Sequence, residues 1–94
     1  MILLASVSVG MNAINFAQKV CMEAIQDLNS SSKKLEDRYR DAGREWKDKK
    51  YEQLGGIVND CNRALKSPID ELFDCVSKLN EIEKVLLEYE NTNL

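Results

Sequence analysis

Hydrophobic residues recur every three or four positions along two stretches of this chain, which a short polar segment separates. A period of this kind places the apolar residues on one face of an α-helix. Within the first stretch, a second polar run, Asn29–Ser32, has poor helix propensity. However, Leu28 and Leu35 keep the same phase across it, which favours a continuous helix whose small serines allow a second helix to approach closely. The first stretch comprises Met11, Ile14, Ala17, Cys21, Ala24, Ile25, Leu28, Leu35, Tyr39, Ala42 and Trp46.

The second stretch follows an approximate heptad stripe, the spacing that coiled coils use. Pro68 interrupts its backbone hydrogen bonding, and Ser67 is a suitable cap for a helix that begins at this proline. The second arm is therefore either one kinked helix or two collinear helices, and the apolar face continues in both cases. The stripe comprises Leu54, Val58, Cys61, Leu65, Pro68, Leu72, Cys75, Val76, Leu79, Ile82, Leu86 and Tyr89.

The segment between the two stretches carries the signals of a tight connection. Gly43 is expected to end the first helix in the left-handed conformation. Asp48 is expected to cap the second helix, with Glu52 in its first turns. Because short connections join antiparallel neighbours, we predict one all-α domain over residues 1–94, an antiparallel two-helix hairpin. Its first arm covers about 5–43, its turn about 44–48 and its second arm about 49–90.

A turn centred near Asp48 also predicts which residues of the two arms face each other. It pairs apolar with apolar residues: Leu35 with Cys61, Leu28 with Pro68, and Cys21 with Cys75. The three cysteines lack the CxxC spacing of zinc or redox sites, so we interpret them as small core residues. Cys21 and Cys75 either pack together in the core or form a disulfide in an oxidising compartment.

The apolar stripe is broader than one hairpin needs, and a lone two-helix hairpin gains little stability from its core. Aliphatic and aromatic residues widen the band: Ile25, Ile57, Ile69, Phe73, Val85 and Leu87. Pairing of two hairpins into a four-helix bundle would cover this surface. The partner is a second copy, another helical hairpin, or the helical N-terminal domain of a larger effector. We predict an interface stripe of Leu54, Val58, Leu65, Leu72, Phe73, Leu79, Ile82 and Leu86.

Composition narrows the function to binding. The 13 basic and 16 acidic residues are mixed and give a net charge of −3, which argues against a nucleic-acid partner. The chain has no histidine, the commonest general base and metal ligand. Its acidic residues lack the spacing of a calcium loop. We therefore expect a protein that is not an enzyme and that carries no catalytic residues, cofactor or metal.

The first residues are apolar but do not match a targeting segment. Met1–Gly10 lacks a basic start and is far shorter than the roughly 20 apolar residues that span a bilayer. We predict neither a cleaved signal peptide nor stable insertion into a membrane. Met11 is an alternative start site.

Trp46, the only tryptophan, lies at the expected turn and reads Trp46-Lys47-Asp48 with Tyr51 three residues further on. With two amphipathic helices and this chain length, the sequence resembles the WXG-type helical hairpins that type VII secretion systems export. The family motif is Trp-x-Gly, and Asp48 replaces its glycine here. A divergent variant, Trp-x-Asp followed by an aromatic residue, is similar and occurs in helical partners of LXG toxins.

The resemblance implies a small adaptor that pairs with a partner hairpin or an effector domain for export. Trp46, Asp48, Tyr51 and Tyr89 would serve recognition by the partner or the secretion machinery. The family's export signal, Tyr-x-x-x-Asp/Glu, is incomplete because Asn93 follows Tyr89, which implies that a partner supplies it. The expected location is the cytoplasm before export, without a cleaved signal. The alternative is an intracellular immunity or antitoxin-type protein that occludes a toxin.

Overall fold

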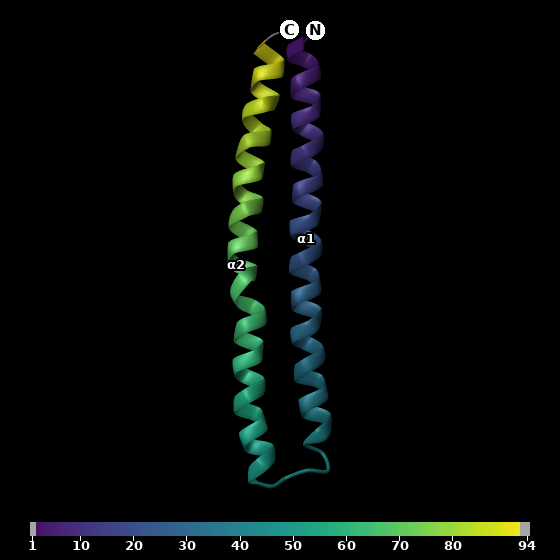
Figure 1. Ribbon diagram of the computed structural model, residues 1–94, viewed down its shortest axis with the longest axis vertical. Coiled ribbons are helices and arrows are strands. Elements are labelled where there is room, and N and C mark those ends of the chain that lie inside the picture. The colour runs from purple at the N-terminus through teal and green to yellow at the C-terminus, as the bar shows by residue number, and fades with distance from the viewer. Residues whose placement is uncertain (1, 93–94) are drawn as a thin grey trace. The chain divides into compact units, whose positions relative to one another are not determined.

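The computed structural model describes residues 2–92, with side chains from 7 to 91. It contains two long helices, α1 (Ile2–Ala42) and α2 (Lys49–Thr92), which a short turn joins (Figure 1). The helices pack against each other, and no strand occurs between residues 2 and 92. The prediction of an all-α helical hairpin is therefore confirmed, and both helices extend slightly further than the sequence indicated.

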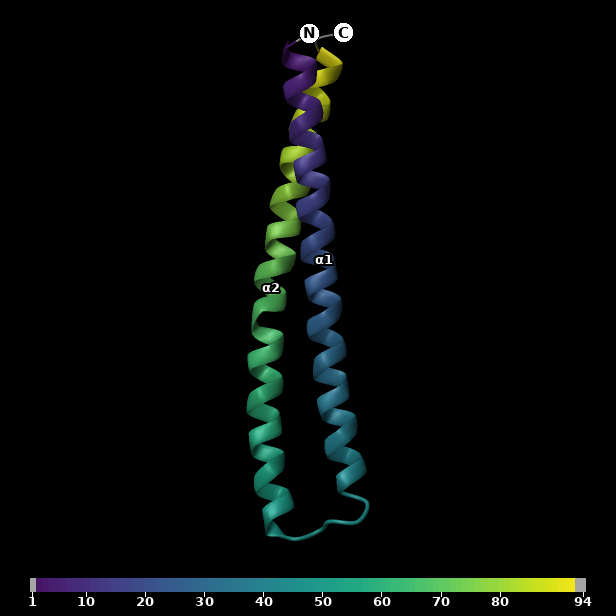
Figure 2. The same ribbon diagram turned by 45° about the vertical axis from the view of Figure 1, so that its right-hand side comes forward.

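Both helices pass through the positions where the sequence left a break open. Ser30–Ser32 lie within α1, and Pro68 lies within α2. Figure 2 shows α1 and α2 from a second side. Ser32 is almost fully buried, with 2% of its surface exposed, so this serine is a point of close approach between helices. Pro68 is exposed. The second arm is thus one helix, not two.

The chain divides into two compact units, each of which pairs a segment of α1 with a segment of α2. The terminal unit comprises Met1–Ala24 and Leu72–Leu94, and the turn unit comprises Ile25–Glu71.

In the turn unit, the buried and half-buried residues of each helix alternate at steps of three and four, the spacing of a coiled-coil seam. Asn62 and Ile69 belong to this seam, whereas Cys61 and Pro68 are exposed. The predicted pairs Leu35–Cys61 and Leu28–Pro68 are therefore wrong. A shift of one residue turns a side chain by about 100° around the helix. The observed seam contains the polar residue Asn62, which a pattern of apolar residues alone does not select. The seam comprises Ile25, Leu28, Ser32, Leu35, Tyr39, Tyr51, Gly55, Val58, Asn62, Leu65 and Ile69.

The terminal unit has a seam of the same spacing. It comprises Val7, Met11, Ile14, Gln18, Cys21, Leu72, Val76, Leu79, Glu83, Leu86 and Glu90. Gly10 lies so close to Leu86 that an added Cβ would be 3.3 Å from its Cδ1. Cys75 is exposed because Val76 takes the seam position, and all three cysteines are free. Cys21 and Cys75 therefore form neither the predicted core pair nor a disulfide.

Candidate interaction sites

Most of the predicted interface stripe is used inside the hairpin. Six of its eight residues are buried or half-buried: Leu54, Val58, Leu65, Leu72, Leu79 and Leu86. Phe73 and Ile82 remain exposed, at 47% and 52% of their surfaces. The exposed apolar side chains of the hairpin therefore lie mostly outside this stripe.

Those side chains concentrate in the terminal unit. Nine large hydrophobic residues are exposed there: Val9, Phe16, Val20, Met22, Phe73, Ile82, Val85, Leu87 and Tyr89. Among the described side chains of the turn unit, only Trp46 and Ile57 are of this kind. The terminal unit also begins with 18 residues that include no charged side chain. This concentration of exposed, large hydrophobic side chains makes the terminal unit a candidate interaction surface.

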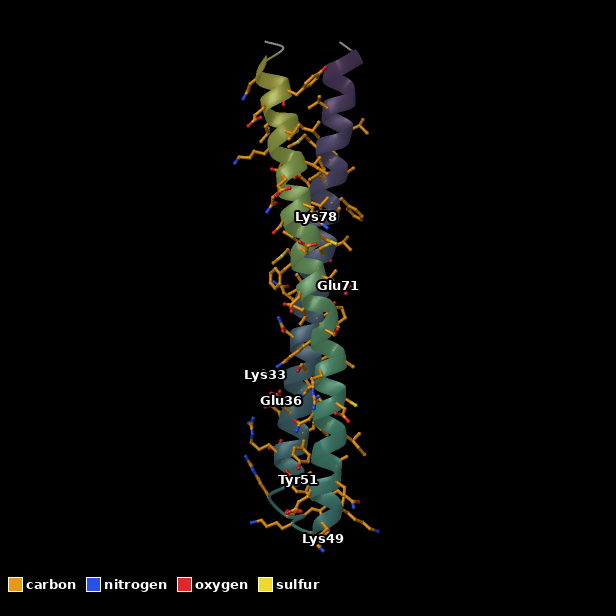
Figure 3. All side chains as sticks on the ribbon, turned by 90° about the vertical axis from the view of Figure 1, so that its left-hand side faces the viewer. Lys33, Glu36, Lys49, Tyr51, Glu71 and Lys78 are labelled. Carbon is orange, nitrogen blue, oxygen red and sulfur yellow. The ribbon has the colours of Figure 1, made fainter. Side chains whose placement is uncertain are left out.

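At the turn, two tyrosines lock the helices together. The rings of Tyr39 and Tyr51 stack with centroids 4.3 Å apart and planes 7° from parallel. The hydroxyl of Tyr39 donates to the backbone carbonyl of Tyr51 at 3.2 Å, and the hydroxyl of Tyr51 donates to the backbone carbonyl of Tyr39 at 2.9 Å. Burial of the ring raises the pKa of Tyr39, and its hydrogen bond with Tyr51 acts in the same direction. The stacked and hydrogen-bonded pair thus fixes one helix against the other beside the turn, where Figure 3 labels Tyr51 near Lys49.

Two glycines make room for these tyrosines. A Cβ on Gly55 would collide with the hydroxyl of Tyr39, and one on Gly43 would collide with the hydroxyl of Tyr51. Tyr39 precedes Gly43 by four residues and Tyr51 precedes Gly55 by four residues. Tyr39 lies over Gly55, and Tyr51 lies over Gly43. No described residue, glycine or other, has a positive φ. The expectation that Gly43 adopts a left-handed cap is therefore wrong, and its role is to leave space for Tyr51.

Asp48 caps α2, as predicted. Its Oδ1 accepts hydrogen bonds from the backbone N–H groups of Lys50, at 2.9 Å, and Tyr51, at 3.2 Å. The Trp46 side chain contributes most to lowering the pKa of Asp48, and the two backbone donors add to this effect. Aspartate at this place thus does what glycine cannot, because its side chain caps the helix.

Trp46 covers the turn without being buried. Its ring lies 5.9 Å from that of Tyr51, tilted by 56°, and 39% of its surface stays exposed. The structure thus brings together Trp46, Asp48 and Tyr51, three of the four residues predicted for recognition. The fourth, Tyr89, belongs to the terminal unit and is 45% exposed. Asn93, which departs from the export motif, lies outside the described residues.

A polar layer that the sequence analysis missed crosses the turn unit. Ser32 Oγ donates to Asn62 Oδ1 at 3.0 Å, and Asn62 Nδ2 donates to Glu36 Oε1 at 3.1 Å. Lys66 Nζ approaches the same carboxylate at 3.9 Å. Beside it, a shallow groove is lined by Glu36, Tyr39, Arg40, Tyr51 and Asn62, among others. The only sequence signal was the seven-residue spacing of Ser32 and Asn62 from seam residues on both sides.

The terminal unit has one polar cluster in its seam. Gln18 Nε2 donates to Asn80 Oδ1 at 2.7 Å and to Glu83 Oε2 at 2.8 Å. No group of three or more potential metal ligands gathers among the side chains described. In the described part of the chain, neither helix combines the length and apolar character that a membrane span requires.

Comparisons with known proteins give no relative. No protein-family model, no curated protein and no solved structure matches the chain.

Proposed function

We propose that this chain is a small helical binding protein that pairs with another helical chain. The observation that carries the proposal is the concentration of exposed, large hydrophobic side chains on the terminal unit, outside the seam. Burial of apolar surface provides about 25 cal/mol for each Å² removed from water. Side chains such as Phe16 and Val85 expose 69% and 62% of their surfaces. Their burial against a partner would provide this free energy for binding.

We further propose that the chain acts as an adaptor of a type VII secretion system and accompanies a helical effector during export. The Trp46-x-Asp48 motif supports this proposal, because Asp48 caps α2 and the ring of Trp46 stays partly exposed at the turn. Partly exposed tryptophans often act as anchors at interfaces. In this proposal the terminal unit binds the partner, and the secretion machinery binds Trp46.

A secretion experiment in the bacterium that encodes the chain tests this role. Strains with and without the type VII ATPase are compared for the tagged chain, and for proteins that co-purify with it, in cells and culture medium. We expect ATPase-dependent release of the chain or of a bound helical effector. The variant W46A should abolish release without changing helix content, whereas W46F should retain part of it.

Two results would contradict the proposal. Release that does not depend on the ATPase, or no release of either chain or partner, would remove the secretion role. If the chain instead captured a toxin inside the cell and abolished its activity, the immunity or antitoxin alternative would replace the adaptor.

A further inference from the structure

The outer surface of α1 in the terminal unit carries a second apolar stripe that the hairpin does not use. Val9, Ala13, Phe16 and Val20 are separated by four, three and four residues, so they share one face of the helix. None belongs to the seam, and all four are exposed. Val9 and Phe16 each expose 69% of their surfaces, and Val20 exposes 47%.

We infer that this stripe binds the same stripe of a second copy of the chain, with the two α1 helices antiparallel. The inference deepens the proposed function by naming the partner of the α1 surface. It rests on the spacing of the stripe, which is four, three and four residues in either chain direction. Two antiparallel copies of the stripe therefore align position for position. A two-fold axis between Ile14 and Asn15 places Val9 opposite Val20 of the second copy, and Ala13 opposite its Phe16.

The sizes of the side chains favour this antiparallel arrangement. Each phenylalanine meets an alanine, and each valine meets a valine, so large and small side chains interdigitate as close packing requires. A parallel arrangement would set Phe16 against Phe16 and leave Ala13 against Ala13. An interface between identical copies with two-fold symmetry has to be self-complementary, and the antiparallel order satisfies this condition.

The distribution of charge points to the same occupant. Residues 1–18 contain no charged side chain, so a charge buried against this stripe would find no counter-charge, and an uncharged surface of similar length is favoured. The second copy provides one. Lys19, the first charged residue, falls opposite the uncharged Gly10 of the other copy, so like charges do not meet across the interface.

Light scattering on the purified full-length chain tests whether the stripe forms a dimer. We expect a concentration-dependent dimer in reductant. The variant F16E should weaken it by about a hundredfold to a thousandfold, because each dimer loses two buried phenylalanines. The control N15E adds the same charge at an exposed position off the stripe and should leave dimerisation unchanged. A monomer at every concentration, or equal effects of the two variants, would overturn the inference.

Disulfide trapping tests the antiparallel order. In a background with C21A, C61S and C75S, chains carrying V9C are mixed with chains carrying V20C and oxidised. The antiparallel dimer predicts that disulfides between positions 9 and 20 dominate, and that N15C chains cross-link poorly. Dominant 9–9 and 20–20 disulfides would overturn the inference.

Circular dichroism on each variant shows whether the helices are kept. These experiments use the chain alone. If dimerisation fails while ATPase-dependent release persists, this inference falls and the proposed function stands. If the dimer forms but neither chain nor partner is released, this inference stands and the proposed secretion role falls.

Discussion

The turn unit and the terminal unit are built from the same two helices and the same seam spacing, yet they use their side chains differently. In the turn unit, polar seam groups satisfy one another: Ser32 bonds Asn62, Asn62 bonds Glu36, and the tyrosine hydroxyls bond opposing backbone carbonyls. In the terminal unit, large apolar side chains remain exposed outside the seam. The comparison indicates that one half of the hairpin fixes register, while the other half carries the exposed apolar surface that we propose for a partner.

The largest expected difference is between a buried and an exposed apolar residue. Ile25, 3% exposed in the turn unit, should cost about 2–5 kcal/mol when replaced by alanine, because a cavity remains. Phe16→Ala in the terminal unit should change the stability of the monomer by no more than about 0.5 kcal/mol. Urea unfolding at concentrations where the chain is monomeric measures both. A large loss for Phe16→Ala would mean that its ring packs within the hairpin.

Removal of the polar layer should cost somewhat less. Asn62→Ala leaves the buried Ser32 hydroxyl without a partner, and we expect a loss of about 1–3 kcal/mol in the free energy of unfolding. The double variant S32A/N62L should recover that stability but lose the single register of the helices, because a buried polar pair specifies alignment. Amide NMR spectra of the double variant should show several sets of peaks. One sharp set would show that the layer does not determine register.

The neighbouring glycines in α2 provide a matched pair with opposite expected signs. Gly55→Ala pushes the Tyr39 hydroxyl away and should destabilise the chain by about 1–3 kcal/mol. Gly56→Ala has no atom within 4 Å of its new Cβ, so it should stabilise by about 0.5–1 kcal/mol through helix propensity. Thermal unfolding of both variants gives the comparison. Equal stabilisation by the two substitutions would contradict the tyrosine lock at the turn.

The smallest expected effect is a pH dependence at the turn. The pKa of Asp48 is lowered, mainly by the Trp46 side chain, so the fold favours the charged carboxylate. Its contribution is present above the ordinary pKa of an aspartate and is lost as pH falls through the lowered value. The variant D48N keeps a capping oxygen and should remove this part of the acid dependence. Identical melting temperatures against pH for both proteins would exclude a stabilising role of the charge.

How much of this could be predicted from the sequence depended on whether a signal was local. The two helices, the turn and the Asp48 cap follow from periodicity and short-range chemistry. The seam itself was misplaced at Cys61, Pro68 and Cys75, because apolar character was taken as a proxy for burial.

The buried polar residues could not be found in this way. Ser32 is buried because Asn62, 30 positions away in the chain, receives its hydrogen bond, and a pairing of this kind is invisible in a hydrophobic pattern. The exposed stripe of Val9, Phe16 and Val20 escaped notice for a related reason. It lies on the opposite side of a helix of which the sequence analysis traced only one apolar face.

Hydrogen–deuterium exchange at several protein concentrations tests the central contrast most directly, because it reports each unit separately in the intact chain. We predict that amide protection in α1 around residues 9–20 rises with concentration, while protection in the turn unit around Ser32, Asn62 and Tyr51 stays constant. Protection that rises in the turn unit instead, or nowhere, would contradict the division between a unit that fixes register and a unit that binds.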